Sequence, residues 1–186
     1  RNSEEIAVCK VEAGMVRLGS AVHFSPSGKE GRVRMIESFG AKLEKAGPGD
    51  SVGLVVETVR GLERGEVVSC LEARPPLAKA FTAEIVLFSD VEVRLGDLLT
   101  VRYGTAERKC QVEEIISEID PISLVTRTEH PISLQPGSVS EVRFRSLEKF
   151  PLERYSDFPQ LGRFVVVGRK GAVAAGIVVD LESDRA

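Results

Sequence analysis

Cysteine and histidine are the residues of this sequence that could act as nucleophiles, bases or metal ligands, and they are few. Three cysteines, Cys9, Cys70 and Cys110, lie far apart, and no CxxC pair occurs. Zinc ribbons and thioredoxin-like redox sites need closely spaced thiols, so both are excluded. All three lie among apolar or alternating residues, where a reduced Cys packs as a small hydrophobe. We therefore expect no metal site and a reducing, cytoplasmic location.

The two histidines, His23 and His130, form no catalytic pattern. His23 lies in an alternating apolar stretch, and His130 precedes a proline in a loop. Neither an HExxH nor a GxSxG motif is present, and residues 24–29 (FSPSGK) lack the first glycine of a phosphate-binding GxxxxGK[ST] loop. We expect no catalytic residue and no cofactor in this chain.

Charge and hydropathy exclude two further classes of protein. The 186 residues include 25 Lys and Arg against 28 Asp and Glu, a formal net charge of −3. A polybasic nucleic-acid binder is excluded, although local basic patches are compatible with this balance. No apolar run reaches the ~20 residues that span a bilayer, so we expect no membrane partner.

The elements that must position any site are short strands. Short apolar or alternating stretches that read as strands occur at 6–11, 31–36, 52–56 and 66–70, each bounded by Gly, Pro or Asp. Turn signals every ~8–12 residues are typical of a barrel or sandwich, and we favour barrels because closure removes exposed edges. Residues 109–119 also fit helical spacing, but we predict a strand that runs into an irregular turn.

Consecutive prolines at Pro75 and Pro76 mark the best domain boundary. Neither can donate to a ladder, and together they hold the backbone extended. The sequence therefore predicts an all-β fold of two closed β-barrels, residues 1–76 and 77–186, joined by a short Pro-Pro linker.

Short motifs follow one another in a specific order along the chain. They are residues 11–19 (VEAGMVRLG), 24–29 (FSPSGK), 46–54 (AGPGDSVGL), 62–68 (LERGEVV), 81–85 (FTAEI), 155–164 (YSDFPQLGRF) and 174–178 (AAGIV). Their order and spacing resemble domains II and III of the elongation factor Tu / one-alpha family of translation GTPases. The motif at 155–164, with Asp-Pro at 120–121, is typical of the archaeal and eukaryotic type.

The resemblance implies two closed β-barrels that bind aminoacyl-tRNA and deliver it to the ribosome. It also implies a GTPase domain that holds GTP and Mg²⁺. That domain and the first strand of domain II are expected to precede the present residues. The chain itself is then expected to have no enzymatic activity, although its parent protein is a GTPase.

In domain II the resemblance places Glu37 where the family contacts the terminal adenosine of tRNA. A carboxylate can accept a hydrogen bond from a ribose hydroxyl or an exocyclic amine. The alternative is a solvated Glu at a strand end. Phe39 is a second candidate because it could stack on a base, although the pattern favours a core side chain.

In domain III the family contacts the T-stem backbone through the hairpin before the last strand. Gly168, Arg169 and Lys170 occupy that place, followed by Gly171. Two cations flanked by glycines can approach phosphates closely, or they can form a solvated hairpin tip. We expect Arg163 to be structural and to pair with an acid between the barrels.

Two other functions fit the same motifs. Release-factor and ribosome-rescue GTPases share these domains but carry a protein that mimics tRNA. The family's archaeal type usually has a His pair where Phe39 and Gly40 stand, and its absence, with the acidic balance, favours this alternative. The GTPase subunit of sulfate adenylyltransferase is a third relative, against which the motif at 155–164 argues.

Overall fold

The structure is a computed structural model that describes residues 5–88, 90–120, 122–123, 125–168 and 171–182. The chain divides into two compact units, residues 1–75 (unit 1) and 76–186 (unit 2). Strands dominate both, and the described residues include one single-turn helix, α1 (Pro159–Gly162). The all-β prediction is confirmed. No helix in the described part of the chain is long and apolar enough to cross a membrane.

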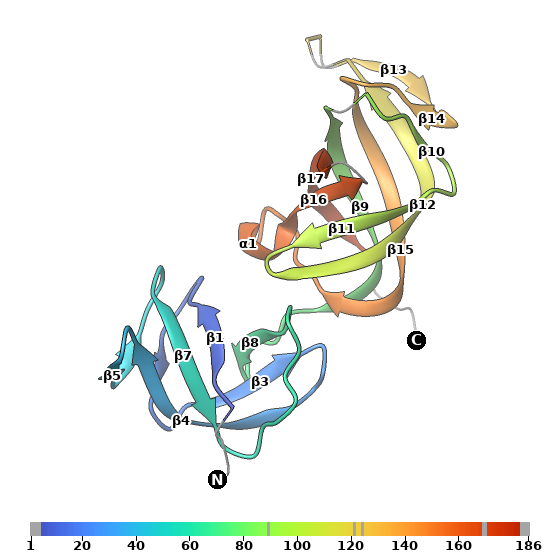
Figure 1. The fold of residues 1–186 in the computed structure, drawn as a ribbon. Helices are drawn as coiled ribbons and strands as arrows, with labels where there is room; N and C mark the ends of the chain where they lie inside the picture. The colour runs from blue at the N-terminus through green and yellow to red at the C-terminus, as the bar shows by residue number, and fades with distance from the viewer. Residues whose placement is uncertain (1–4, 89, 121, 124, 169–170, 183–186) are drawn as a thin grey trace. The chain divides into compact units, whose positions relative to one another are not determined.

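Unit 1 is built around one antiparallel sheet with the strand order β1-β7-β4-β3-β8, which β5 extends beside β4 (Figure 1). A separate two-stranded ribbon pairs β2 with β6. The strands are β1 (Ala7–Lys10), β2 (Val16–Arg17), β3 (Ala21–Ser25), β4 (Glu30–Ser38), β5 (Ala41–Leu43), β6 (Lys45–Ala46), β7 (Ser51–Val56) and β8 (Val67–Cys70). Phe24 and Ile36 are fully buried between these strands.

The unit 1 sheet is open in the part of the chain that the structure describes. There, β1 pairs with β7 alone and β8 pairs with β3 alone, so no ladder joins the two edges. A closed barrel in unit 1 therefore stays a prediction.

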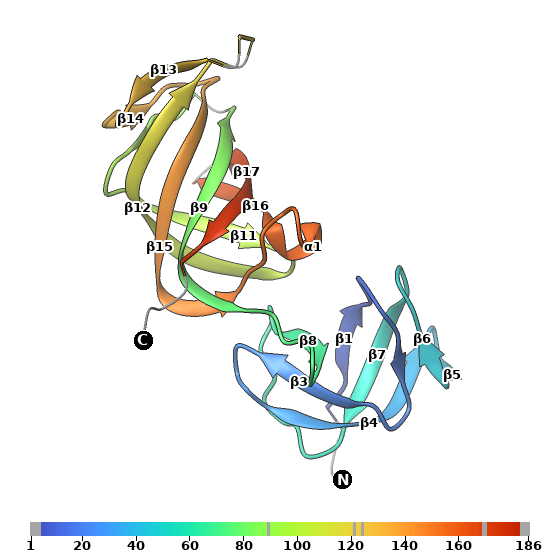
Figure 2. The same cartoon turned by 180° about the vertical axis from the view of Figure 1, so that it is seen from behind.

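Unit 2 closes its sheet on itself. The order β11-β16-β17-β9-β15-β12 returns to β11, and this six-stranded circle confirms the predicted barrel. Figure 2 shows β17, β9 and β15 side by side. The strands are β9 (Leu77–Leu87), β10 (Val93–Arg94), β11 (Leu98–Tyr103), β12 (Ala106–Ile119), β13 (Thr126–Glu129), β14 (Ser133–Leu134), β15 (Val139–Pro151), β16 (Arg163–Gly168) and β17 (Gly171–Leu181).

Strand β12 explains why residues 109–119 also fit helical spacing. Its register against β15 shifts between Val112 and Glu114 and again between Ile115 and Ser117. A bulge inserts one extra residue, so Val112 and Ile115 both face the core although they are three residues apart. The predicted strand is confirmed, but the irregular turn expected within 109–119 is wrong: β12 continues to Ile119 and takes up the extra residues as bulges.

An aromatic cluster fills the barrel of unit 2. The rings of Phe81 and Phe144 stack with centroids 5.4 Å apart, and Phe164 meets Phe81 edge-on at 5.6 Å. Both arrangements suit the quadrupoles of aromatic rings. The glycine of the 155–164 motif is structural, because a Cβ on Gly162 would lie 2.5 Å from the Cα of Tyr155. This motif therefore closes α1 against the barrel and supplies Phe164 to its core.

Candidate functional site

Glu37 lies near the end of β4, between two neighbouring strands. Its cross-strand partners are Lys42 on β5 and Gly53 on β7. A Cβ on Gly53 would lie 3.2 Å from Cγ of Glu37 and 2.8 Å from Cγ2 of Ile6. The side chains of Glu37 and Ile6 thus fill the space that the missing side chain leaves. Glu37 is half-buried near the end of β4, and its role as a tRNA contact stays a prediction.

Phe39 and Gly40 form the tip of the β4–β5 hairpin. Both have positive φ, 48° and 80°, and the flanking residues Ser38 and Ala41 pair with each other. Two positive-φ residues match the twist that a tight hairpin needs. The turn projects the Phe39 side chain into solvent, where it is fully exposed, so the prediction that it packs in a core is wrong. An exposed ring is available for stacking on a planar group.

The hairpin is held against β7 by polar contacts. The hydroxyl of Ser38 donates to the carbonyl of Ser51, 2.8 Å away. The turn before β7 is closed by Asp50, whose carboxylate accepts a hydrogen bond of 2.8 Å from the backbone N–H of Gly47. The motif at 46–54 therefore positions β7, and with it Gly53, under Glu37.

The second predicted site lies at the β16–β17 hairpin. Gly168 and Gly171 pair across its ends, while Arg169 and Lys170 lie outside the described residues. Arg163 begins β16 with an exposed side chain. Its predicted pairing with an acid between the barrels stays a prediction.

The cysteines differ in environment. Cys110 is fully buried in the barrel core, and burial raises the pKa of its thiol to about 12. Burial also raises the pKa of Cys9, which is half-buried. Cys70 is exposed, so the prediction of a packed thiol fails there. The thiol pKa falls, not rises, at a reactive cysteine, so neither Cys9 nor Cys110 is suited to catalysis.

The histidines lie apart and in different settings. His23 is buried in β3, where its Nδ1 lies 3.2 Å from the hydroxyl of Ser25. His130 is exposed, with Nδ1 3.2 Å from a carboxylate oxygen of Glu114. Over the described ranges, no group of three or more His, Cys, Asp or Glu side chains could hold a metal ion.

Two residues of the Glu37 site, Gly53 and Ile6, were not predicted from the sequence. A glycine inside an apolar strand often marks a close approach, and this signal was present at residues 52–56. Nothing in the alternating pattern could have named Ile6, because the registers of β1 and β4 against β7 bring it to Glu37.

Comparisons with known proteins agree with this architecture. Residues 80–179 match the family described as GTP-eEF1A C-terminal domain-like. The chain is 34% identical over 180 residues to Elongation factor 1-alpha of Saccharolobus solfataricus and 33% identical over 183 residues to that of Metallosphaera sedula. These alignments cover 95% and 97% of the chain, but 41% and 42% of the relatives. The chain thus spans about two fifths of their length.

A crystal structure of sup35 complexed with GDP superposes with a TM-score of 0.87 at 21% identity, over 96% of this chain and 44% of that one. At this identity the likeness shows the fold. The match over residues 80–179, which is more than half of the sequence, shows the family. The chain belongs to the GTP-eEF1A C-terminal domain-like family.

Proposed function

We propose that this chain forms the tRNA-binding domains of a GTP-dependent translation elongation factor that delivers aminoacyl-tRNA to the ribosome. The sequence identity to proteins named Elongation factor 1-alpha supports the class of function. The observation that carries the proposal is the half-buried Glu37 packed over Gly53, two residues before the exposed Phe39 at the tip of the β4–β5 hairpin.

The chemistry of this arrangement suits the 3′ end of tRNA. The carboxylate of Glu37 accepts hydrogen bonds from an exocyclic amine or a ribose hydroxyl. Ile6 supplies an apolar surface next to it, and Phe39 can stack on a planar base. Adenosine offers the amine, the hydroxyls and the planar ring together. In this proposal Arg169 and Lys170 contact the phosphates of the T-stem.

The GTPase activity belongs to another part of the protein in this proposal. No residue motif of the chain forms a phosphate-binding loop, so its own residues do not fit GTP and Mg²⁺. We assign both ligands to a GTPase domain outside these residues. The two units then act by binding and orienting the tRNA in the cytoplasm, and the chain alone hydrolyses no GTP.

A second candidate cargo is a protein that mimics tRNA. A fully exposed aromatic side chain at a hairpin tip is also typical of a protein-binding hot spot, and Phe39 is one. The net charge of −3 is compatible with this cargo. The half-buried carboxylate of Glu37 favours tRNA, because it has a defined partner on adenosine.

The test compares two tRNAs, one intact and one lacking the terminal adenosine, on the full-length protein with a GTP analogue bound. A hydrogen bond to a charged group contributes about 1.5–3 kcal/mol, so we expect the wild type to prefer the intact tRNA by roughly tenfold or more. Glu37→Ala should lose most of that preference. Glu44→Ala, which removes an exposed acid that follows β5, is the matched control and should keep it.

If Glu37→Ala prefers the intact tRNA as strongly as the wild type does, Glu37 does not contact the terminal adenosine and this assignment is wrong. If neither tRNA binds the wild type, the protein cargo becomes the better explanation. The double comparison isolates the contact between Glu37 and the adenosine from other effects of the substitution.

A further inference from the structure

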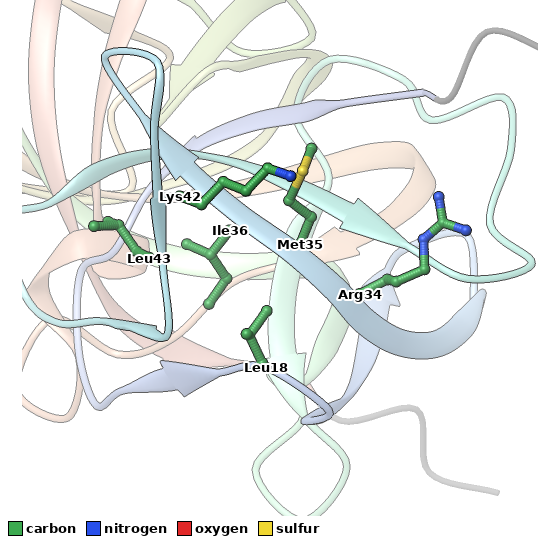
Figure 3. Close-up of a pocket in the computed structure, with 6 residues that line it drawn as sticks. All are labelled: Leu18, Arg34, Met35, Ile36, Lys42 and Leu43. Atoms are coloured by element: carbon green, nitrogen blue, oxygen red, sulfur yellow. The ribbon is translucent and has the colours of Figure 1, made fainter.

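The hollow in unit 1 that Figure 3 shows lies over the core. It has a volume of about 320 Å³ and lies beside β4. Its lining residues are Leu18, Arg34, Met35, Ile36, Lys42 and Leu43. Ile36 is fully buried and belongs to the hydrophobic core of unit 1, so we assign the hollow no ligand. A more distinctive surface lies on the barrel of unit 2.

An apolar row crosses the outer face of four neighbouring strands of unit 2. Val86 on β9 pairs with Val139 on β15 and with Ala175 on β17, and Val139 pairs in turn with Ile119 on β12. Residues directly opposite each other in a ladder point to the same face, so these four form one line across strands that Figure 2 shows side by side. Val86 is 46% exposed, which places the apolar row outside the barrel.

This row is unusual for the outside of a barrel. Outward positions of an antiparallel sheet are normally polar because they meet water. Phe88 lies two residues beyond Val86, and its N–H donates to the carbonyl of Val173 at 3.1 Å, so the ladder beside β17 continues to Phe88. Its ring is 56% exposed. Exposed apolar side chains that gather on one face are typical of a surface that another protein covers.

An acidic row runs parallel to the apolar row. Glu84 on β9 pairs with Glu141 on β15, Glu141 pairs with Ser117 on β12, and Ser117 pairs with Glu129 on β13. Glu84 and Glu141 each lie two residues from the apolar row along their strands, so both rows are on the outer face. Like charges directly opposite each other in a ladder destabilise a sheet. The pair formed by Glu84 and Glu141 therefore has a cost to the fold.

The described part of unit 2 does not neutralise the acidic row. No side-chain hydrogen bond or ion pair joins Glu84, Glu129 or Glu141 to another described residue. Arg143, the next cation along β15, already pairs with Glu114 at 3.6 Å. The phosphates of a nucleic acid would be repelled by these carboxylates. The charge on this face is therefore complementary to a cationic partner.

We propose that this face of unit 2 binds an amphipathic basic helix of another protein. The apolar side of the helix packs on the apolar row, and lysines or arginines beside it pair with the acidic row. Each row crosses four strands, a span of about 14 Å, which about three turns of helix match. A helix presents parallel lines of side chains, whereas an extended segment turns every second side chain away. The surface requires neither Glu37 nor a tRNA cargo.

The test measures binding of the 186-residue chain to a labelled peptide by fluorescence anisotropy. The peptide has about 14 residues, with leucines along one side of a helix and lysines along the next. A second peptide with glutamates in place of the lysines should bind roughly tenfold more weakly, because like charges would then meet. Absence of binding by the lysine peptide, or equal binding by the two peptides, would overturn the proposal.

The acidic row is tested by Glu84→Gln and Glu141→Gln together. Exposed ion pairs are weak and are screened by salt, so this double variant should bind the lysine peptide roughly fivefold more weakly and with less dependence on salt. It should also raise the unfolding temperature of unit 2 slightly, because a like-charge pair is removed.

The matched control removes two acids of unit 2 that already pair with arginines. Glu92 lies 2.6 Å from Arg94, and Glu107 lies 2.5 Å from Arg102. Replacing Glu92 and Glu107 together with Gln changes the net charge by the same amount and should leave peptide binding unchanged. Equal weakening by the two double variants would overturn the proposal, because binding would then follow net charge alone.

The apolar row is tested by Val86→Ser. This substitution removes apolar contact but no charge, so it should weaken binding of the lysine peptide roughly fivefold without changing its dependence on salt. Leu98→Ser is the control, because Leu98 is an exposed apolar residue outside the row and its loss should have no effect. Equal affinity of Val86→Ser and the wild type would overturn the proposal. If sedimentation shows a dimer that Val86→Ser abolishes, a second copy of the chain covers this face and the proposal is wrong.

Discussion

Unit 2 closes its six strands into a barrel, whereas unit 1 leaves the edges of β1 and β8 without a ladder in the described residues. The unit with the closed sheet also has the larger hydrophobic core. The described core of unit 2 contains 21 buried residues, including stacked and edge-on aromatic rings, and that of unit 1 contains nine. Buried apolar area is the main source of stability, so unit 2 is expected to be the more stable scaffold.

The Glu37 candidate site lies in the unit with the smaller core. Glu37 is half-buried and Phe39 is fully exposed at a hairpin tip, whereas the 155–164 motif of unit 2 is largely explained by packing. In the proposed function, the family motif at 155–164 and the tRNA site at Glu37 therefore do not coincide. A rigid barrel can be specified by residues that touch no ligand, while a scaffold's binding residues often lie on projecting loops and turns.

The largest effect is expected from the aromatic core. Phe144→Ala should destabilise unit 2 by about 3–5 kcal/mol, because it removes a fully buried ring stacked on Phe81. Phe24→Ala is the counterpart in unit 1. Calorimetry should show two unfolding transitions, and each variant should lower the temperature of one. If there is a single transition and both variants lower its temperature equally, the two units do not unfold separately and their stabilities do not differ as expected.

A smaller effect is expected where a glycine packs against backbone. Gly162→Ala would place a Cβ 2.5 Å from the backbone N and Cα of Tyr155, so unit 2 should lose roughly 1–3 kcal/mol. Gly47→Ala in unit 1 is the control, since a Cβ there would meet nothing within 4 Å and its change should stay within about 0.5 kcal/mol. Urea unfolding of both variants measures the difference. Similar losses would show that the close approach at Gly162 relaxes without cost.

Strand type was predictable from the sequence, but sheet closure was not. Alternation at residues 31–36 predicted β4, and the short apolar run at 52–56, which is buried on both faces, predicted β7. Whether β1 meets β8 depends on pairings between distant segments, which no local pattern encodes. The aromatic cluster was not predictable for the same reason, because Phe81 and Phe144 meet through the register of β9 against β15.

The candidate site was predictable in part. The resemblance placed Glu37, and the structure adds Gly53 and Ile6 around it. The interpretation of Phe39 as a core residue failed because an aromatic residue with positive φ is uncommon in a turn, so the Phe-Gly pair gave no clear hairpin signal.

The thiol of Cys110 gives a pH test confined to unit 2. Burial raises its folded-state pKa to about 12, above the ordinary value of 9.0, so the folded state keeps the thiol neutral while the unfolded state ionises. Stability should fall as pH rises above about 9, by about 1 kcal/mol per pH unit until about pH 12. Urea unfolding at about pH 8, 9 and 10 should show this loss in the wild type. Cys110→Ala should lose less stability over the same pH range. If the variant and the wild type lose the same amount, the Cys110 thiol is not the cause of the pH dependence.

The smallest effect is expected at Glu5 in unit 1. Its carboxylate accepts hydrogen bonds of 2.8 Å from the backbone N–H groups of Leu62 and Gly61, and these contacts lower its pKa, the contact with Leu62 most strongly. A lowered folded-state pKa stabilises the fold above about pH 4.5, and this stabilisation is lost as pH falls through the folded value. Glu5→Gln should slightly lower the unit 1 transition at neutral pH and reduce its dependence on acid. Calorimetry at about pH 3.5, 4.5 and 7 measures the effect. If the unit 1 transition depends on acid as strongly in Glu5→Gln as in the wild type, the Glu5 carboxylate does not stabilise unit 1 in this way.

The central claim is that the Glu37 site receives the aminoacylated end of tRNA. The most direct measurement follows spontaneous hydrolysis of the aminoacyl ester of a labelled tRNA, with and without the full-length protein loaded with GTP. Slower hydrolysis in its presence is the predicted result, because a bound 3′ end is shielded from water. An unchanged rate of hydrolysis at protein concentrations of tens of micromolar would contradict the claim. At these concentrations, a binding free energy of about −6 to −7 kcal/mol would already give substantial binding.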